Sequence, residues 1–153
     1  MNVKPYTTEY QSQCLAIFDS NVGVYFDPSE RNDFVAYLED ANAVQHYFVF
    51  EEQGTVVACG GYFANQNTGS LAWGMVHRLY HRRGFGAEIT DFRMAQIKRI
   101  SSIDRIKIET SQLTQGFYAK RGFEVTDIVE NGYGQGIDYV SMTFHCGDYQ
   151  TSE

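Results

Sequence analysis

The spacing of apolar residues in this chain changes between a helical period of about 3.6 residues and short extended runs. The helical period comes first, and the Asp27-Pro28 pair is typical of a helix start. Two extended runs then flank Gln53-Gly54, which predicts an antiparallel hairpin. We expect helices over 8–20 and from Asp27 to about Ala41, and strands at 3–7, 47–50, 55–59 and 71–76.

The rest of the chain alternates helices with strands. We expect a loop at 65–69, a helix at 84–100, a strand at 103–110, a helix at 113–121, and strands at 124–129 and 137–144 around a glycine-rich turn at 131–136. Gly122 is predicted to end the short helix in a left-handed conformation, with apolar Phe123 just beyond. The order β-α-α-β-β-β-α-β-α-β-β predicts an α/β (α+β) fold, with a mixed, mostly antiparallel seven-stranded sheet flanked by about four helices.

The length and composition favour one globular domain over 1–153. The 153 residues include only two prolines and no linker or repeat, and 15% aromatic residues argue against disorder. The apolar runs are too short to span a membrane, and the N-terminus lacks the apolar stretch of a signal peptide. Cys14, Cys59 and Cys146 lack metal-ligand spacing, so we expect free thiols in a reducing cytoplasm and no metal site.

The charges are unevenly distributed along the chain. Residues 78–121 carry ten cations and four acids, a net charge of +6, while 1–77 carry −7 and 122–153 carry −6. The total of −7 argues against nucleic acid or an acidic membrane as a partner of the whole surface. The basic segment predicts a local anion site, although charges scattered along solvated helix faces would give the same count.

The stretch Arg82-Arg83-Gly84-Phe85-Gly86-Ala87 stands where a predicted strand gives way to a predicted helix. The first amides of a helix lack internal partners and carry the positive end of its dipole, so they attract anions. Gly84 and Gly86 leave those amides accessible, and the two arginines add positive charge. The stretch is neither a P-loop nor a Rossmann fingerprint, because it lacks Gly-Lys-Ser/Thr and has Ile89 at the third glycine position. A plain helix start would also use such residues.

A second motif, Phe117-Tyr118-Ala119-Lys120-Arg121-Gly122-Phe123, lies further along the chain. Together the two stretches resemble the GNAT superfamily of acetyl-CoA-dependent N-acetyltransferases. That family has a pattern close to Val-x-x-x-x-Gln/Arg-x-x-Gly-x-Gly/Ala, followed by a segment like Phe-Tyr-x-x-x-Gly-Phe. The predicted order of elements also matches, so the resemblance covers essentially the whole chain and implies a GNAT-like fold. The chain departs from the pattern at His81, where Gln or Arg is usual, and at Arg78, where many members have proline.

The resemblance implies acetyl-CoA as the cosubstrate. Backbone amides of residues 82–87 would hold the pyrophosphate, and residues 74–76 would bind the pantetheine arm like an added strand. An amide of that strand would polarise the acetyl carbonyl. The implied cofactor-binding residues are Gly74, Met75, Val76, His81, Arg82, Arg83, Gly84, Phe85, Gly86, Ala87 and Tyr118.

The resemblance also implies two catalytic residues. Tyr118 would protonate the departing thiolate, since a phenol with a pKa of about 10 is still protonated at neutral pH. Glu109, at the end of a predicted strand, would accept the proton of the attacking amine. His77 or a water molecule remains an alternative base. The family's usual route is direct attack in a ternary complex, without a covalent enzyme intermediate.

The implied acceptor is a cationic primary amine of a small molecule or peptide, and a homodimer is a further expectation. Residues expected to line the acceptor groove are Asp27, Glu30, Asp33, Glu39 and Asp40, with Tyr25, Phe26, Tyr37, Tyr62, Phe63 and Trp73 as apolar walls. Two alternatives stay open at this point. A non-catalytic acyl-CoA-binding sensor or partner module would bind acetyl-CoA without releasing thiol, and an unrelated nucleotide-binding domain would bind ATP equally well.

Overall fold

The computed structural model describes residues 1–146 as one mixed sheet with helices on both faces. The strands are β1 (Asn2–Pro5), β2 (Tyr47–Glu52), β3 (Thr55–Asn65), β4 (Thr68–Val76), β5 (Arg105–Thr110), β6 (Glu124–Gly134) and β7 (Ile137–His145). The α-helices are α1 (Gln11–Ser20), α2 (Arg31–Leu38), α3 (Phe85–Lys98) and α4 (Gln115–Ala119). Short 3₁₀ turns are η1 (Thr8–Tyr10), η2 (Pro28–Glu30), η3 (Ala43–His46) and η4 (Arg78–Tyr80).

The seven strands follow the order β1-β2-β3-β4-β5-β7-β6, and only the β4–β5 pair is parallel. The predicted fold class is therefore confirmed. The single domain over 1–153 stays a prediction, and residues 147–153 of it lie outside the described residues. Within residues 1–146, no helix is long and apolar enough to cross a membrane.

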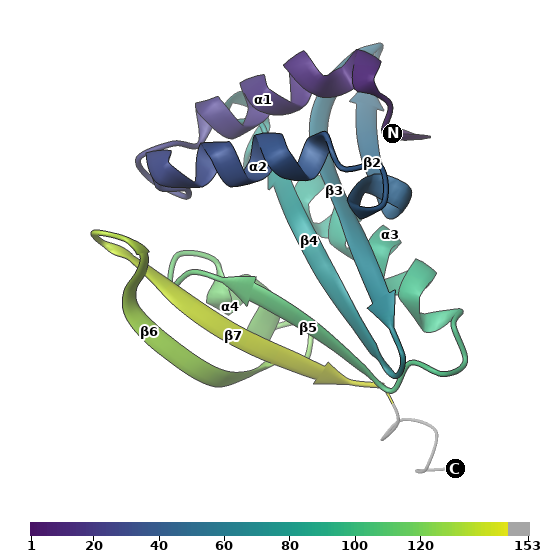
Figure 1. Cartoon of the computed structure of the whole chain (residues 1–153), viewed down its shortest axis with the longest axis vertical. Helices are drawn as coiled ribbons and strands as arrows, with labels where there is room; N and C mark the ends of the chain where they lie inside the picture. Colours follow the sequence, from purple (N-terminus) through teal and green to yellow (C-terminus); the bar gives the residue numbers. More distant parts are fainter. Residues whose placement is uncertain (147–153) are drawn as a thin grey trace.

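The sheet opens between β4 and β5. Their pairing covers only Thr68, Gly69 and Ser70 against Arg105 to Lys107. Beyond these residues the two strands diverge, as Figure 1 shows, so that β5, β6 and β7 swing away from β1 to β4. In the same view α1 and α2 cover the front of β2 to β4, while α3 lies behind them. The edge of β4 that faces β5 is consequently unpaired over most of its length.

A β-bulge in β4 lies at the point where the strands diverge. Trp73 and Gly74 both stand opposite the single residue Gly60, so the register shifts by one. Trp73 has a φ of 46°, which is unusual for a bulky side chain. The hydroxyl of Tyr47 donates a hydrogen bond of 2.8 Å to the Trp73 carbonyl and so holds the bulge in place.

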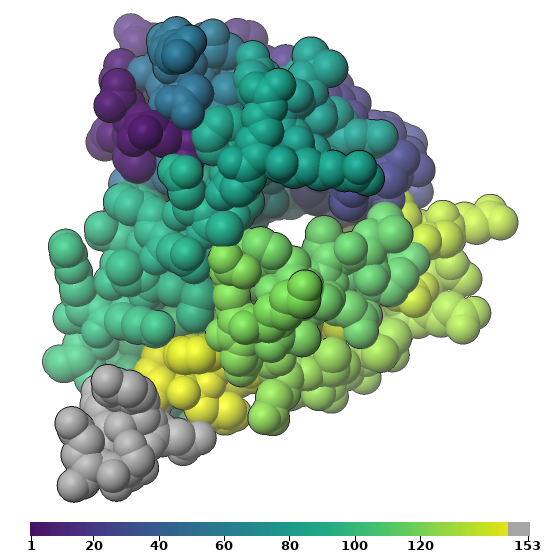
Figure 2. All heavy atoms as spheres, turned by 180° about the vertical axis from the view of Figure 1, so that it is seen from behind, coloured from purple at the N-terminus to yellow at the C-terminus, as the bar shows by residue number. Residues whose placement is uncertain are grey.

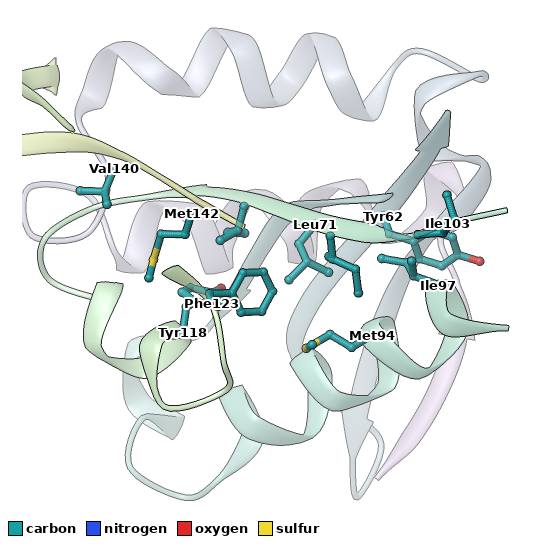
Figure 3. Close-up of a cluster of buried hydrophobic side chains, with 11 residues drawn as sticks. Tyr62, Leu71, Met94, Ile97, Ile103, Tyr118, Phe123, Val140 and Met142 are labelled. Carbon is teal, nitrogen blue, oxygen red and sulfur yellow. The ribbon is translucent and has the colours of Figure 1, made fainter. Parts of the chain in front are cut away.

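Two main hydrophobic cores hold the two parts of the sheet. One packs α1 and α2 onto β2 to β4, with Phe18 and Phe34 completely buried. The other joins α3, α4 and β5 to β7 near the closed end of the sheet, and Figure 3 shows its side chains converging. Its buried members are Tyr62, Leu71, Met94, Ile97, Ile103, Ile106, Ile108, Tyr118, Phe123, Val140 and Met142. The second core bridges the two diverging strands and therefore fixes their opening.

Several predicted boundaries were wrong, each for a local reason. The loop predicted at 65–69 is a two-residue turn between β3 and β4, in which Gln66 adopts a φ of 55°. The turn predicted at 131–136 is also shorter, because β6 continues through a bulge to Gly134. The helix predicted to reach Ala41 ends at Leu38, where the Asp40 carboxylate accepts two backbone N–H groups. The predicted helix 113–121 is only the five residues of α4, because a turn at Ser111 precedes it.

Candidate active site

A cavity of about 690 Å³ fills the opening between β4 and β5. Its walls come from the diverging strands, from the first turns of α3 and from α4. Its roof comes from the segment between α1 and α2 and from the β6–β7 hairpin. Figure 2 shows a hollow on the rear face between the teal atoms of the β4–α3 region and the green atoms of α4. The cavity thus gathers residues from both halves of the chain.

The turn before α3 is shaped for an anion. Arg82 has a φ of 66° and Gly84 a φ of 84°, and left-handed residues in a turn can direct neighbouring backbone N–H groups at one anion. Among residues 1–146, no side chain caps the first amides of α3. A Cβ added at Gly84 or Gly86 would meet nothing within 4 Å, so the approach to these amides is open. The geometry therefore fits a phosphate group at this helix start.

The side chains of His81 and Arg83, which were expected at the phosphates, contact other groups of the protein. The His81 ring lies with Nε2 2.7 Å from the Val76 carbonyl oxygen. The Arg83 guanidinium lies over the Tyr80 ring, 5.2 Å from its centroid. Among the expected cofactor-binding residues, Gly74, Met75, Val76, His81, Arg82, Phe85, Gly86 and Tyr118 line the cavity, whereas Arg83, Gly84 and Ala87 do not. The backbone of these three residues still belongs to the turn and the first residues of α3.

The unpaired edge of β4 forms one wall of the cavity through Gly74, Met75 and Val76. The Val76 carbonyl is already engaged, because the Asn21 side chain donates to it at 3.0 Å in addition to the His81 contact. The Met75 side chain points into the core beneath α1. Because β5 pairs only with Thr68 to Ser70, the other backbone groups of this edge could pair with an extended ligand, as with an additional strand.

Tyr118 lies in α4 at the inner wall of the cavity. Gly122, with a φ of 94°, ends this helix as predicted, and the Phe123 N–H donates to the Tyr118 carbonyl at 3.1 Å. The Tyr118 ring packs edge-on against Phe117 and Phe123, with centroids 5.1 and 5.6 Å away. Its hydroxyl makes no hydrogen bond with any described residue and, unlike the Tyr37 hydroxyl, is not sealed from solvent. It is therefore free to donate a proton to a ligand.

Two carboxylates face the roof of the cavity. Glu109 lies one residue before the end of β5 and accepts a hydrogen bond from the Tyr139 hydroxyl. Glu30 accepts the Asp27 N–H at 2.9 Å, and burial raises the pKa of Glu30 to about 7 against the effect of that hydrogen bond. Tyr133 also lines the cavity, near both carboxylates. Its burial, and then the negative charges of Glu109 and Glu30, raise the pKa of its phenol. The roof thus combines acidic groups with aromatic rings.

Other predicted site residues lie elsewhere. His77 does not line the cavity, and its Nδ1 accepts the Leu79 N–H at 3.2 Å. Of the acidic residues expected in the groove, Glu30 lines the cavity, and Asp27, Asp33, Glu39 and Asp40 do not. Of the expected aromatic walls, Tyr25, Phe26, Tyr37 and Trp73 line it. Tyr62 lies in the core, and Phe63 is exposed away from the cavity.

Sequence reasoning missed several residues of the cavity. Tyr139 comes from β7, and Asn21 follows α1, so no local motif connects either with the site. Arg93 was counted only as part of the basic segment, yet it is buried and lines the cavity. The periodicity of α3 is the one signal that could have singled it out, because Arg93 follows Ile89 and Thr90 on the inward face.

Glu30 predicts a pH-dependent contribution to stability. Its pKa is raised in the folded state from 4.5 to about 7, so the folded protein holds this proton more tightly than the unfolded chain does. The stabilisation is complete below pH 4.5 and is lost as the pH rises through about 7. In denaturant unfolding, the free energy of unfolding of the wild type should therefore fall relative to that of Glu30→Gln as the pH rises from 4.5 to about 7. Glu39→Gln, at an exposed position just after α2, is the control, and a constant difference for Glu30→Gln would contradict the prediction.

Comparison with known proteins agrees with this geometry. The family model of the GNAT acetyltransferase domain matches residues 26–146. No curated protein matches the chain significantly in sequence. Among solved structures, the ribosomal-protein-S18-alanine N-acetyltransferase of Escherichia coli is similar with a TM-score of 0.77 at 14% identity, covering 95% of this chain and 93% of that one.

Two further solved structures have the same fold. Ard1 from Thermoplasma volcanium gives a TM-score of 0.76 at 14% identity, covering 94% of this chain and 96% of its own. The Salmonella typhimurium protein yncA, solved with its cofactor acetyl-CoA, gives 0.72 at 14% identity, covering 95% and 94%. Identities this low establish the fold alone. Because the family model spans most of the chain and the fold agrees, this chain belongs to the GNAT family of acetyltransferases.

Proposed function

We propose that this protein transfers an acetyl group from acetyl-CoA to a primary amine by direct attack in a ternary complex. The observation that carries the proposal is a single cavity that joins the helix-start turn to Tyr118 and Glu109. The turn suits a diphosphate, and the unpaired edge of β4 suits an extended arm that bears amides. Bound acetyl-CoA would supply an acyl group activated as a thioester.

The residues of the cavity divide the proton transfers between them. An alkylammonium ion has a pKa of about 10.4, so it must lose a proton before its nitrogen can attack the thioester carbon. Glu109, held by the Tyr139 hydroxyl, accepts this proton. As the new C–N bond forms and the C–S bond breaks, Tyr118 donates its proton to the leaving sulfur. The second proton lost by the amine nitrogen then restores the phenol, directly or through water, and Glu109 releases the first proton to solvent. A backbone amide of β4 donates to the carbonyl oxygen as its charge grows, a contact worth about 3–4 kcal/mol in comparable sites.

The proposed acceptor is a cationic amine of a small molecule or peptide. Glu30 and Glu109 supply negative charge at the roof, and aromatic rings such as Tyr133 offer cation–π faces. The acidic net charge of −7 argues against nucleic acid or an acidic membrane as a partner. The three cysteines are free, which supports a reducing cytoplasm. A homodimer stays a prediction, for which exposed Val125, Ile128 and Val129 on edge strand β6 are candidate contacts.

The proposal is tested by combining heat stability with thiol release. Acetyl-CoA should raise the melting temperature, ATP should do so much less, and a panel of primary amines should contain one that accelerates release of free CoA. Stabilisation without amine-dependent thiol release would instead support the sensor or partner module. Equal stabilisation by ATP and acetyl-CoA would remove the specific role proposed for the cavity.

Replacing Glu109 by Gln should lower kcat/KM about 10²-fold at neutral pH, the lower end of the usual contribution of a general base, because the amine then loses its proton acceptor. The loss should shrink as the pH rises toward the amine pKa of about 10.4, since the neutral amine becomes abundant without help. The pH–rate profiles of wild type and variant measure this. Glu124→Gln, at an exposed position that does not line the cavity, is the matched control and should keep the wild-type profile. A loss in Glu109→Gln that is constant with pH would rule out the base role.

A further inference from the structure

Arg93 is a buried cation without a counter-ion. Only 1% of its surface is exposed, although it stands on α3 and borders the cavity. No Asp or Glu among residues 1–146 lies within ion-pair distance of its guanidinium. Burying an unpaired charge is costly, so an anionic group of a ligand in the cavity would stabilise this site.

The hydrogen bonds of Arg93 leave donors unused. Its Nε donates to the Ile89 carbonyl at 3.2 Å, Nη1 to the Gly61 carbonyl at 3.3 Å and Nη2 to the Thr90 hydroxyl at 3.4 Å. All three acceptors are neutral and the distances are long. An arginine has five N–H donors in a fork that matches a carboxylate, so at least two remain for another group.

Glycines in β3 and β4 leave room for the Arg93 side chain. A Cβ on Gly74 would lie 2.5 Å from Nη2, and a Cβ on Gly60 would lie 3.3 Å from Cζ. Glycines at the β4 bulge therefore make the room that the guanidinium occupies. Gly74 also belongs to the strand edge that would hold the pantetheine arm, so the cation lies beside the path of that arm.

Arg93 lies on α3 well beyond the helix-start turn that would hold the phosphates. Arg93 follows Phe85, the first residue of α3, by eight positions, which is about 12 Å along a helix. Phosphates at the start of α3 would therefore leave the pantetheine arm and the acyl group, not the nucleotide, on the side of this cation. The bordering residues Thr90 and Gly74 belong to the α3 and β4 walls, whereas the acidic groups lie on other elements, Glu30 in the roof and Glu109 on β5.

We propose that Arg93 is the recognition residue of a carboxylate subsite in this cavity, so that a substrate of the reaction carries a carboxylate. The position beside Gly74 favours the far end of the acyl chain, as in malonyl- or succinyl-CoA. A carboxylate on the amine acceptor has the same chemistry, and the experiment separates the two sources. This inference rests on the proposed function.

The first arm of the test measures binding of acyl-CoA pairs of equal carbon number, malonyl against propionyl and succinyl against butyryl. Wild type should bind the carboxylated member about tenfold more tightly or better, as expected for a charge-assisted pair. Arg93→Met should abolish this ratio while retaining acetyl-CoA binding. Arg99→Met, an exposed arginine just after α3, is the matched control and should keep the ratio.

The second arm measures thiol release from acetyl-CoA with amino acids and with the amines that lack their carboxylate, such as lysine against cadaverine. A preference for the carboxylated acceptor that Arg93→Met removes would assign the subsite to the acceptor. Arg93→Lys, which keeps the charge, should preserve part of the preference if Arg93→Met does not fold. Absence of any carboxylate preference of wild type in both arms would overturn the inference. Failure to bind acetyl-CoA at all would instead refute the proposed function.

Discussion

Tyr118→Phe should reduce the rate of acetyl transfer about 10²- to 10⁴-fold, because general acid catalysis typically contributes that much. Only the hydroxyl is removed, and that hydroxyl makes no hydrogen bond with the described residues. The ring contacts with Phe117 and Phe123 remain, so α4 and its core should stay in place. Steady-state kinetics should show the loss in kcat, whereas the affinity for acetyl-CoA should be nearly unchanged.

The control for this variant is Tyr80→Phe. Tyr80 also lines the cavity, but its ring packs between the Arg83 guanidinium and Phe85 beside the helix-start turn. Its hydroxyl has no proposed part in the reaction, so kcat should change little. Wild-type turnover in Tyr118→Phe would remove the role of Tyr118 as acid and leave protonation of the sulfur to water.

Gly86→Leu should weaken binding of acetyl-CoA by at least about a hundredfold, because two or more charge-assisted hydrogen bonds of about 1.5–3 kcal/mol each would be lost. A side chain at Gly86 would project into the open space in front of the first amides of α3. Phosphate oxygens could then no longer approach those amides. Titration calorimetry with acetyl-CoA and with free CoA measures the effect, which should be equal for both ligands.

The protein itself should tolerate this substitution. Gly86 lies inside α3 without a positive φ, and no atom stands within 4 Å of the added Cβ. Leucine also has the higher helix propensity, so the melting temperature should not fall. Glu88→Leu adds the same side chain at an exposed position of the same turn that does not line the cavity, and should leave affinity nearly unchanged. Unaltered affinity in Gly86→Leu would mean that the phosphates bind elsewhere.

Local patterns predicted most of the fold. The hairpin at Gln53-Gly54, the helix start at Asp27 and the left-handed stop at Gly122 all occur as expected. Each depends on contacts within a few residues: the Asp27 side chain, for example, accepts the Ser29 N–H at 3.0 Å. The boundaries that were wrong, such as the end of β6 at Gly134, depend on pairing between distant residues that no local pattern reports.

The candidate site was predictable only in part. The turn at 82–87 and Tyr118 belong to sequence motifs, and the structure brings both to one cavity. Glu30 was predicted as part of an acidic groove, but its raised pKa depends on its burial in the folded protein, within the roof of the cavity. The pairing of Glu109 with Tyr139 joins different strands, and the burial of Arg93 depends on glycines in β3 and β4. Such contacts between distant segments leave no signal in a single sequence.

The amino-acid sequence by itself determined the order of helices and strands, the glycine-containing helix start and the placement of a tyrosine beside a left-handed helix stop. These features follow from hydrophobic period and backbone preference, which act over a few residues. Only the tertiary structure decided how far β4 and β5 diverge, which carboxylates face the cavity and which arginine is buried without a counter-ion among residues 1–146. Those outcomes depend on how separate elements pack, because burial and electrostatic environment are properties of the assembled fold.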